Sequence, residues 1–137
     1  MKAIFPVFAV ALVVLAFSTA CSHVEEKEQV NSFKKDVLDY GRMLRWRNYE
    51  DATRFLRQRD HTRVESHPEE LKDLRITAYD LVRTTFTPEG DEAEIVARIE
   101  YYYDGSNVVE EIEDTQDWWY EKEEKRWYLD GNLPEFD

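Results

Sequence analysis

The segment AEIVARIEYYYDGSNVVEEIEDTQDWWYEKEEKRWYL, residues 93–129, contains three stretches with the alternation of β-strands and eight aromatic residues. In the first stretch, residues 93–103, apolar residues occupy every second position, and charged residues such as Arg98 and Glu100 lie between them. This period makes one face of a strand apolar and leaves the other in water. Such a strand is typical of an antiparallel sheet that is covered on one side.

Three more strands are predicted around this one. The sequence Asp-Gly-Ser-Asn at residues 104–107 predicts a hairpin loop that leads to a strand over residues 108–120. After a charged turn, residues 127–129 begin a last strand. Upstream, residues 75–87 are rich in β-branched and aromatic side chains and predict a first long strand. Together these stretches predict a curved antiparallel sheet of about four strands.

Residues 30–44 have a helical period instead. Apolar residues at spacings of three and four line one face of this helix, namely Val30, Phe33, Val37, Tyr40 and Leu44. Asn48 is the expected N-cap of a second helix. The capping-box pattern at residues 66–69, with a proline in its first turn, predicts a short third helix that ends near Asp73. The expected fold class is α+β, with N-terminal helices packed on the curved antiparallel sheet.

The length and the charge of the chain limit the number of domains and the kinds of partner that it can have. A chain of 137 residues is long enough for a single domain. The net charge is −12, and it is unevenly placed: residues 22–87 balance 13 acids with 13 bases, whereas residues 88–137 contain 17 acids and four bases. This surplus of acids repels phosphates, so nucleic acid is excluded as a partner. A single cysteine, Cys21, excludes a disulfide within the chain.

The N-terminal segment has the order of a secretory signal. Lys2 is followed by an apolar run over residues 3–17 and then by small residues. Residues 22–29 are polar and could span at most about 25 Å when extended. We therefore divide the chain into a signal peptide at residues 1–20, a lipidated cysteine with a short tether at residues 21–29, and a folded domain at residues 30–137.

The sequence Phe-Ser-Thr-Ala-Cys-Ser at residues 17–22 resembles the lipobox of bacterial lipoproteins. Ala20 and Thr19 fit that motif, whereas Ser18 departs from its usual leucine. The resemblance implies a diacylglyceryl group on Cys21, cleavage just before it, and attachment to the cell envelope. Ser22 after the cysteine implies the outer membrane, with the domain facing the periplasm. An ordinary signal peptide with a chance cysteine and an uncleaved membrane anchor are the alternatives.

The order of elements in residues 30–131 resembles the cone-shaped nuclear-transport-factor-like superfamily. The matching signals are the opening helix, the sequence Asn-Tyr-Glu-Asp-Ala at residues 48–52, and the Trp118-Trp119 pair that is expected to form a hairpin with residues 127–129. That superfamily includes both enzymes and non-catalytic binding modules, so the resemblance implies a fold and leaves the activity open. A shorter helix-plus-sheet arrangement like that of cystatin is the competing architecture.

An isomerase-like or dehydratase-like enzyme in such a cone would need a carboxylate base that faces a tyrosine in an apolar pocket. Asp39 with Tyr40, or Asp80 with Tyr101 or Tyr103, are the candidate pairs. No catalytic motif accompanies them, and solvated or arginine-paired aspartates are the plainer interpretation.

No metal or other cofactor is predicted. His61 and His67 lack the spacing of a zinc site. The acidic residues between Glu110 and Asp117 lack the glycine of a calcium loop, and a charged outer strand that prevents edge pairing is their expected role.

Aromatic residues on the sheet are the best candidates for binding. Consecutive residues on a strand face opposite sides, so either Tyr102 or its two neighbours, and one of Trp118 and Trp119, must point away from the helices. These residues either belong to the sheet core or form a patch for an envelope protein or a small apolar ligand. The favoured function is a membrane-anchored, non-enzymatic binding or assembly module of the envelope.

Overall fold

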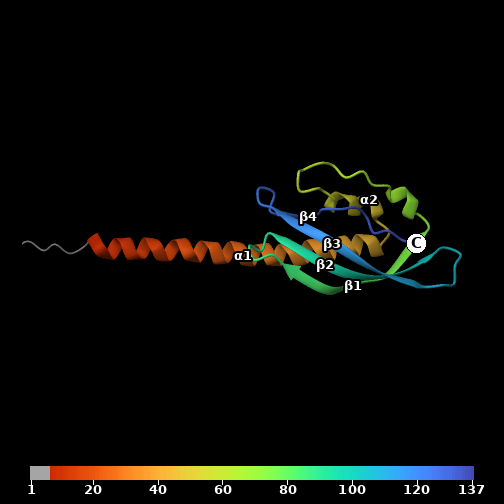
Figure 1. The fold of residues 1–137 in the computed structure, drawn as a ribbon, viewed down its shortest axis with the longest axis horizontal. Coiled ribbons are helices and arrows are strands. Elements are labelled where there is room, and N and C mark those ends of the chain that lie inside the picture. The colour runs from red at the N-terminus through yellow and green to blue at the C-terminus, as the bar shows by residue number, and fades with distance from the viewer. Residues whose placement is uncertain (1–6) are drawn as a thin grey trace, which may run out of the picture.

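The protein is an α+β domain in which a long helix and a short one cover a four-stranded antiparallel sheet (Figure 1). The computed structural model describes the backbone of residues 7–137 and the side chains of residues 24–137. The sheet is open and has the order β1-β2-β3-β4, so each strand pairs with the next one in the sequence. The predicted fold class is therefore confirmed.

The four strands lie within a few residues of their predicted positions. They are β1 (Leu74–Phe86), β2 (Glu92–Tyr103), β3 (Glu110–Glu121) and β4 (Arg126–Leu129). The edge strand β1 shifts register against β2 twice, between Ile76 and Ala78 and between Leu81 and Arg83. Such irregularities increase the local twist of a strand and help to protect an exposed edge. They account for the curvature of the sheet around the helix.

Helix α1 (Val7–Arg45) lies along the concave side of the sheet with the predicted face inward. Phe33, Val37, Tyr40 and Leu44 are buried, whereas Val30, the first residue of the predicted face, is 45% exposed. In Figure 1 the N-terminal part of the helix runs on beyond the end of the sheet, so fewer groups are available there to cover an apolar side chain.

The described residues of the predicted tether continue α1. Residues 24–29 belong to α1 and are helical, so this part of the chain rises about 1.5 Å per residue instead of the roughly 3.3 Å of an extended chain. Its end is fixed to the domain, because the indole Nε1 of Trp127 donates a hydrogen bond of 2.9 Å to the carbonyl of Gln29.

The second helix begins where it was predicted but without the predicted cap. Helix α2 (Tyr49–Ala52) continues into the 3₁₀ turn η1 (Thr53–Phe55), and Asn48 makes no side-chain capping bond. The backbone N–H of Asn48 instead bonds to the carbonyl of Met43 at 2.8 Å, and Arg47 adopts a left-handed φ of 62°. This is the Schellman ending of α1, which places Asn48 in the closure of the preceding helix.

The third predicted helix is only a turn. Residues Pro68–Leu71 form the 3₁₀ segment η2, and no side chain caps it. The capping box expected at residues 66–69 is therefore not formed. Its proline does lie in the first turn, as predicted, where its missing N–H costs nothing.

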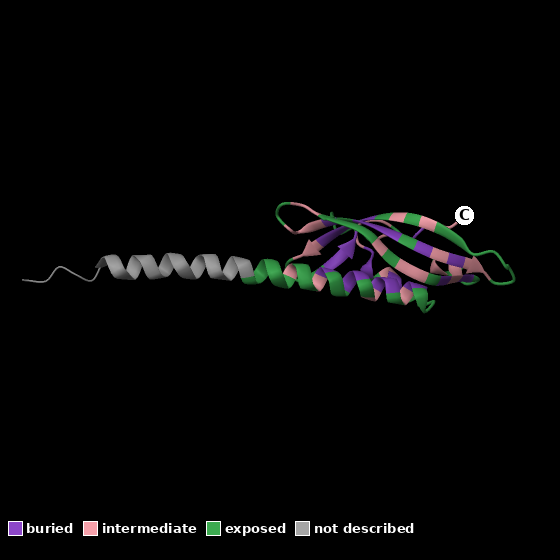
Figure 2. Cartoon of the chain, turned by 90° about the horizontal axis from the view of Figure 1, so that it is seen from below, coloured by how far each residue is buried: buried purple, intermediate pink, exposed green. Residues whose placement is uncertain are grey.

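Aromatic rings fill the space between α1 and the sheet. Around Trp118, which is fully buried, the rings of Tyr40, Phe55 and Phe33 lie edge-to-face at centroid distances of 5.6, 6.2 and 6.4 Å. Figure 2 shows the buried residues concentrated where the helix faces the sheet. A second connection is polar: the buried carboxylate of Asp36 accepts the backbone N–H of Trp127 at 3.0 Å.

Candidate functional site

The three aromatic residues proposed for binding lie in different surroundings. Trp118 is fully buried in the core, Trp119 is 7% exposed, and Tyr102 is half-buried on the outer face of the sheet. Trp119 points to the side opposite Trp118, where its Nε1 donates a hydrogen bond of 2.7 Å to the carbonyl of Arg57. Its ring packs against those of Tyr128 and His61. Neither tryptophan therefore offers an exposed ring face, and only Tyr102 of the three is partly open to solvent.

The loop that covers Trp119 comes from the segment after η1. The backbone N–H of Arg57 bonds to the carbonyl of Leu129 at 3.0 Å, and Leu56 pairs with Leu129 as an isolated bridge. Sequence alternation correctly placed Trp118 and Trp119 on opposite faces of β3, but it did not decide which of them points away from the helices. It also could not predict the loop that covers Trp119, because that contact joins residues 62 positions apart.

Cys21, the predicted site of lipid attachment, lies outside the residues whose side chains the structure describes. The predicted signal peptide at residues 1–20 likewise falls there. Within residues 24–137, no helix combines the length and the apolarity needed to cross a membrane.

The structure does not bring together the carboxylate–tyrosine pairs proposed for an enzyme. The carboxylate of Asp39 lies at the surface between the Lys35 amine at 3.0 Å and the Arg42 guanidinium at 2.7 Å, whereas Tyr40 points into the core. Asp80 is exposed on β1, where it is in register with Arg98. Tyr101, in register with Ile76, is not opposite Asp80.

The histidines and the acidic strand are surface features. His61 lies 3.5 Å from a Glu121 oxygen, and His67 lies 3.2 Å from a Glu69 oxygen. In the part of the chain that the structure describes, no three His, Cys, Asp or Glu side chains are grouped so that they could hold a metal. On the outer face, Arg98 lies 3.5 Å from both Glu111 and Glu113, in keeping with a charged solvated strand.

A buried polar chain that was not predicted from the sequence connects β1 with β3. The side-chain oxygen of Gln116 accepts hydrogen bonds from the Tyr79 hydroxyl at 3.1 Å and from the Trp118 indole at 3.0 Å. The Gln116 amide in turn donates to the Asp114 carboxylate at 2.7 Å. Gln116 is 1% exposed. The signal for this chain was present in the sequence, because Asp114 and Gln116 fall in phase with Ile112 and Trp118 on the inward face of β3.

The chain ends at the Tyr79 hydroxyl on one side and at a groove beside Asp114 on the other. The Tyr40 hydroxyl is buried and has no hydrogen-bond partner among the described residues, and its ring lies 6.3 Å from that of Tyr79. Asp114 lines an open groove of about 480 Å³ between β3 and the C-terminal segment that includes Leu133 and Glu135. That volume is within the range of about 300–1,000 Å³ that small-molecule sites occupy.

Burial keeps the chain largely uncharged. It raises the pKa of Tyr40 and of Tyr79, so both hydroxyls remain protonated and can act as donors. Burial also raises the pKa of Asp114, against the opposing effect of its hydrogen bond from Gln116, and the negative charge of Glu135 adds to the increase. Asp114 is therefore the member of the chain whose proton is held more tightly than that of an ordinary carboxyl.

We expect the stability of the domain to fall as the pH rises through the pKa of Asp114. A carboxyl whose folded pKa is raised binds its proton more tightly when folded than when unfolded, so deprotonation favours unfolding. Asp114→Asn removes this titration and keeps an oxygen that can accept the bond from Gln116. Urea unfolding between pH 4 and 7 should show a larger decline of the free energy of unfolding in the wild type than in Asp114→Asn. The other carboxyls titrate in both proteins, so the difference between them reports Asp114. An identical pH dependence of the two proteins would contradict the assignment.

No family model matches the chain, and no curated protein matches it.

Proposed function

We propose that the protein is a lipid-anchored protein of the bacterial cell envelope, attached through acylated Cys21 and working as a non-enzymatic binding or assembly module. The lipobox-like sequence at residues 17–22 is the observation on which this rests, because it follows directly on an apolar run and contains the only cysteine of the chain. The proposed location is the outer membrane, with the domain on the periplasmic side.

The structure supports a domain that is held close to the membrane. The chain passes from Val24 into the domain as continuous helix, and Gln29 is already bonded to Trp127. The eight helical steps from Cys21 to Gln29 would span only about 12 Å. The order of helices and strands also supports membership of the nuclear-transport-factor-like superfamily. The binding partner in this proposal is an envelope protein or a small apolar ligand.

Lipid attachment is tested by metabolic labelling with palmitate. We expect the wild-type protein to incorporate the label and to fractionate with membranes, and Cys21→Ser to lose the label completely. Ser22→Cys in the Cys21→Ser background is the matched control, because it restores a thiol one position away from the cleavage motif and should remain unlabelled. An unlabelled wild-type protein that is recovered free of membranes would overturn the proposal.

A second candidate is a small enzyme of the isomerase or dehydratase type. The observation that favours it is the buried chain, in which Asp114 with a raised pKa is linked through Gln116 to the Tyr79 hydroxyl. In this candidate Asp114 replaces Asp39 and Asp80 as the base. Titration of the Asp114 carboxyl by NMR separates the candidates, since an ordinary pKa would leave the enzyme without a base.

A further inference from the structure

The side of α1 that faces away from the sheet is basic. Its exposed positions repeat at spacings of three and four, so they share one face of the helix. We call this surface the outer face of α1, and its members are Val24, Lys27, Asn31, Lys34, Lys35, Leu38, Arg42, Arg45 and Trp46. It contains five cations, and the exposed Glu28, which lies five full turns before Trp46, belongs to the same face.

The nearest acids lie at the border of this face. Asp39 is 24% exposed and is held between Lys35 and Arg42, at 3.0 and 2.7 Å, which leaves the pair of cations with an excess of one positive charge. Glu25, Glu26 and Glu28 are exposed at the N-terminal end of the described part of α1, so the positive charge is confined to the part of the face between Lys34 and Arg45. Lys34 and Arg45 make no ion pair with any described residue.

Apolar side chains lie among these cations. Leu38 is 43% exposed and Trp46 is 67% exposed, the highest exposure of any large hydrophobic side chain in the described part of the protein. Trp46 continues the helical bonding, since its N–H donates to the carbonyl of Arg42 at 3.0 Å. The Arg42 guanidinium lies 6.0 Å from the centre of the Trp46 ring. An exposed tryptophan beside arginines is a combination suited to the boundary between headgroups and acyl chains.

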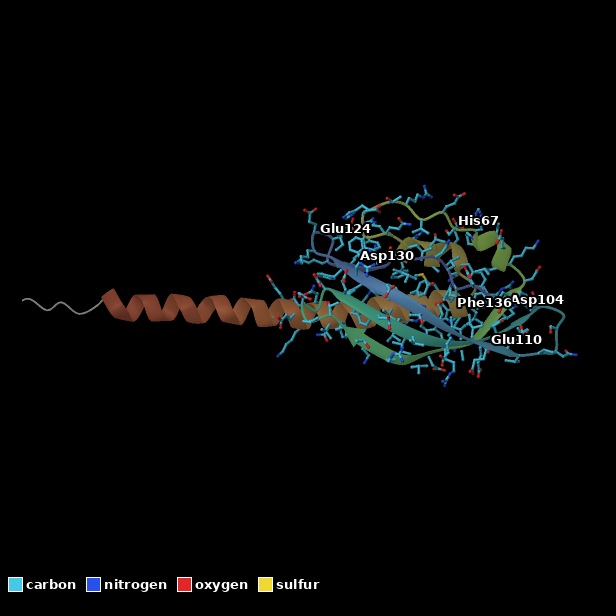
Figure 3. All side chains as sticks on the ribbon, in the orientation of Figure 1. His67, Asp104, Glu110, Glu124, Asp130 and Phe136 are labelled. Atoms are coloured by element: carbon cyan, nitrogen blue, oxygen red, sulfur yellow. The ribbon has the colours of Figure 1, made fainter. Side chains whose placement is uncertain are left out.

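The acidic surplus of the protein lies in the other layer. Residues 88–137, which form β2, β3, β4 and their turns, have 17 acids against four bases. Figure 2 shows α1 on one side of the domain and the sheet on the other, and the acids labelled in Figure 3 belong to the sheet, its turns and the C-terminal segment. An anionic surface would therefore attract the cations on the outer face of α1 and repel the layer formed by residues 88–137.

We propose that the outer face of α1 binds the anionic headgroups of the bilayer to which the protein is anchored, so that the helix lies along the membrane and the sheet points away from it. This inference rests on the proposed lipid anchor. Lys27 is six residues from Cys21 and Trp46 is 25 residues from it, which along a continuous helix corresponds to about 9 and 37 Å. With one end of the helix fixed at the surface, the face needs only to tilt down to meet the headgroups.

A fluorescent probe at Leu38 tests the orientation in the full-length acylated protein. Acylation blocks Cys21, the only native cysteine, so Leu38→Cys supplies a single thiol for an environment-sensitive dye. We expect a blue-shifted emission in vesicles that contain phosphatidylglycerol and none in vesicles of phosphatidylcholine alone. High salt should reverse the shift, because it screens exposed charges. Val109→Cys, at a 61% exposed site on the opposite layer, should show no shift in either.

Charge reversal supplies the matched control. Lys34→Glu with Arg45→Glu should abolish the shift, since each cation at an anionic surface contributes roughly a factor of five and their loss lowers the equilibrium constant for docking of the face at least about 25-fold. Arg63→Glu with Lys122→Glu changes the net charge equally, outside α1, and should leave the shift intact. An unshifted Leu38 probe in anionic vesicles would overturn the proposal.

Flotation distinguishes this failure from that of the anchor. An acylated protein floats with both kinds of vesicle whatever the orientation of α1. A protein that floats with neither kind would refute the anchor and with it the orientation, whereas flotation without a probe shift refutes the orientation alone.

Discussion

Trp118→Ala is expected to lower the free energy of unfolding by about 3–5 kcal/mol, the usual cost of truncating a buried tryptophan. Trp118 is fully buried and contacts the rings of Tyr40, Phe33 and Phe55, so its removal leaves a cavity that no single neighbour can fill. Small domains have a total stability of about 5–15 kcal/mol, so the loss is a large fraction of it. Urea denaturation followed by circular dichroism measures it without depending on tryptophan emission.

Trp118→Phe is the control for this prediction. It preserves one aromatic ring in the core and removes the rest of the indole, including the N–H that bonds to Gln116, whose oxygen keeps its bond from Tyr79. We expect it to cost less than half as much as Trp118→Ala. If Trp118→Ala left the stability unchanged and instead weakened the capture of an envelope partner, the ring would be a contact for that partner and its place in the core would be wrong.

The strands could be predicted because their signal is local. Alternation over residues 93–103 assigned Ala93, Ile95, Ala97 and Ile99 to one face, and all four are buried. The helical period of residues 30–44 likewise identified the buried face of α1. Burial on one side imposes these periods on the sequence, so a single chain is enough to recognise them.

Features that depend on distant residues could not be predicted in this way. Asn48 has the composition of an N-cap, but the left-handed Arg47 before it places its N–H in the ending of α1. Trp119 was one of the candidates for an exposed aromatic patch, because no residue near it in the sequence indicates the loop around Arg57 that covers it. The Asp114–Gln116 chain was overlooked for a similar reason, since its meaning depends on Tyr79 in another strand.

The outer face of α1 explains why the first helix contains two patterns. Its apolar residues at Phe33, Val37, Tyr40 and Leu44 pack on the sheet, and its cations cluster on the opposite side. Acidic residues are exposed near the N-terminal end of the described helix, and the excess of cations lies between Lys34 and Arg45. Such an excess is what a function at an anionic surface would require.

Gly41→Ala is expected to destabilise the domain, although alanine normally stabilises a helix by about 1 kcal/mol relative to glycine. A Cβ at this position would lie 2.4 Å from Cδ1 and 2.6 Å from Cε1 of Tyr79, far inside van der Waals contact. The Tyr79 ring is held by its bond to Gln116 and by the ring of Tyr40, so it cannot simply turn away. The overpacking should reach the upper end of the usual cost of about 1–3 kcal/mol and outweigh the gain in helix propensity.

A double-mutant cycle identifies the cause of that loss. Tyr79→Leu removes the ring atoms that the new methyl group would strike, so Gly41→Ala should cost much less in that background than in the wild type, and the difference is the interaction energy between the two sites. Gly131→Ala is the matched control, because a Cβ there meets no atom within 4 Å, and thermal unfolding should leave its stability nearly unchanged. Equal effects of Gly41→Ala in both backgrounds would mean that the close approach of α1 to β1 at Tyr79 is not what fixes glycine at this position.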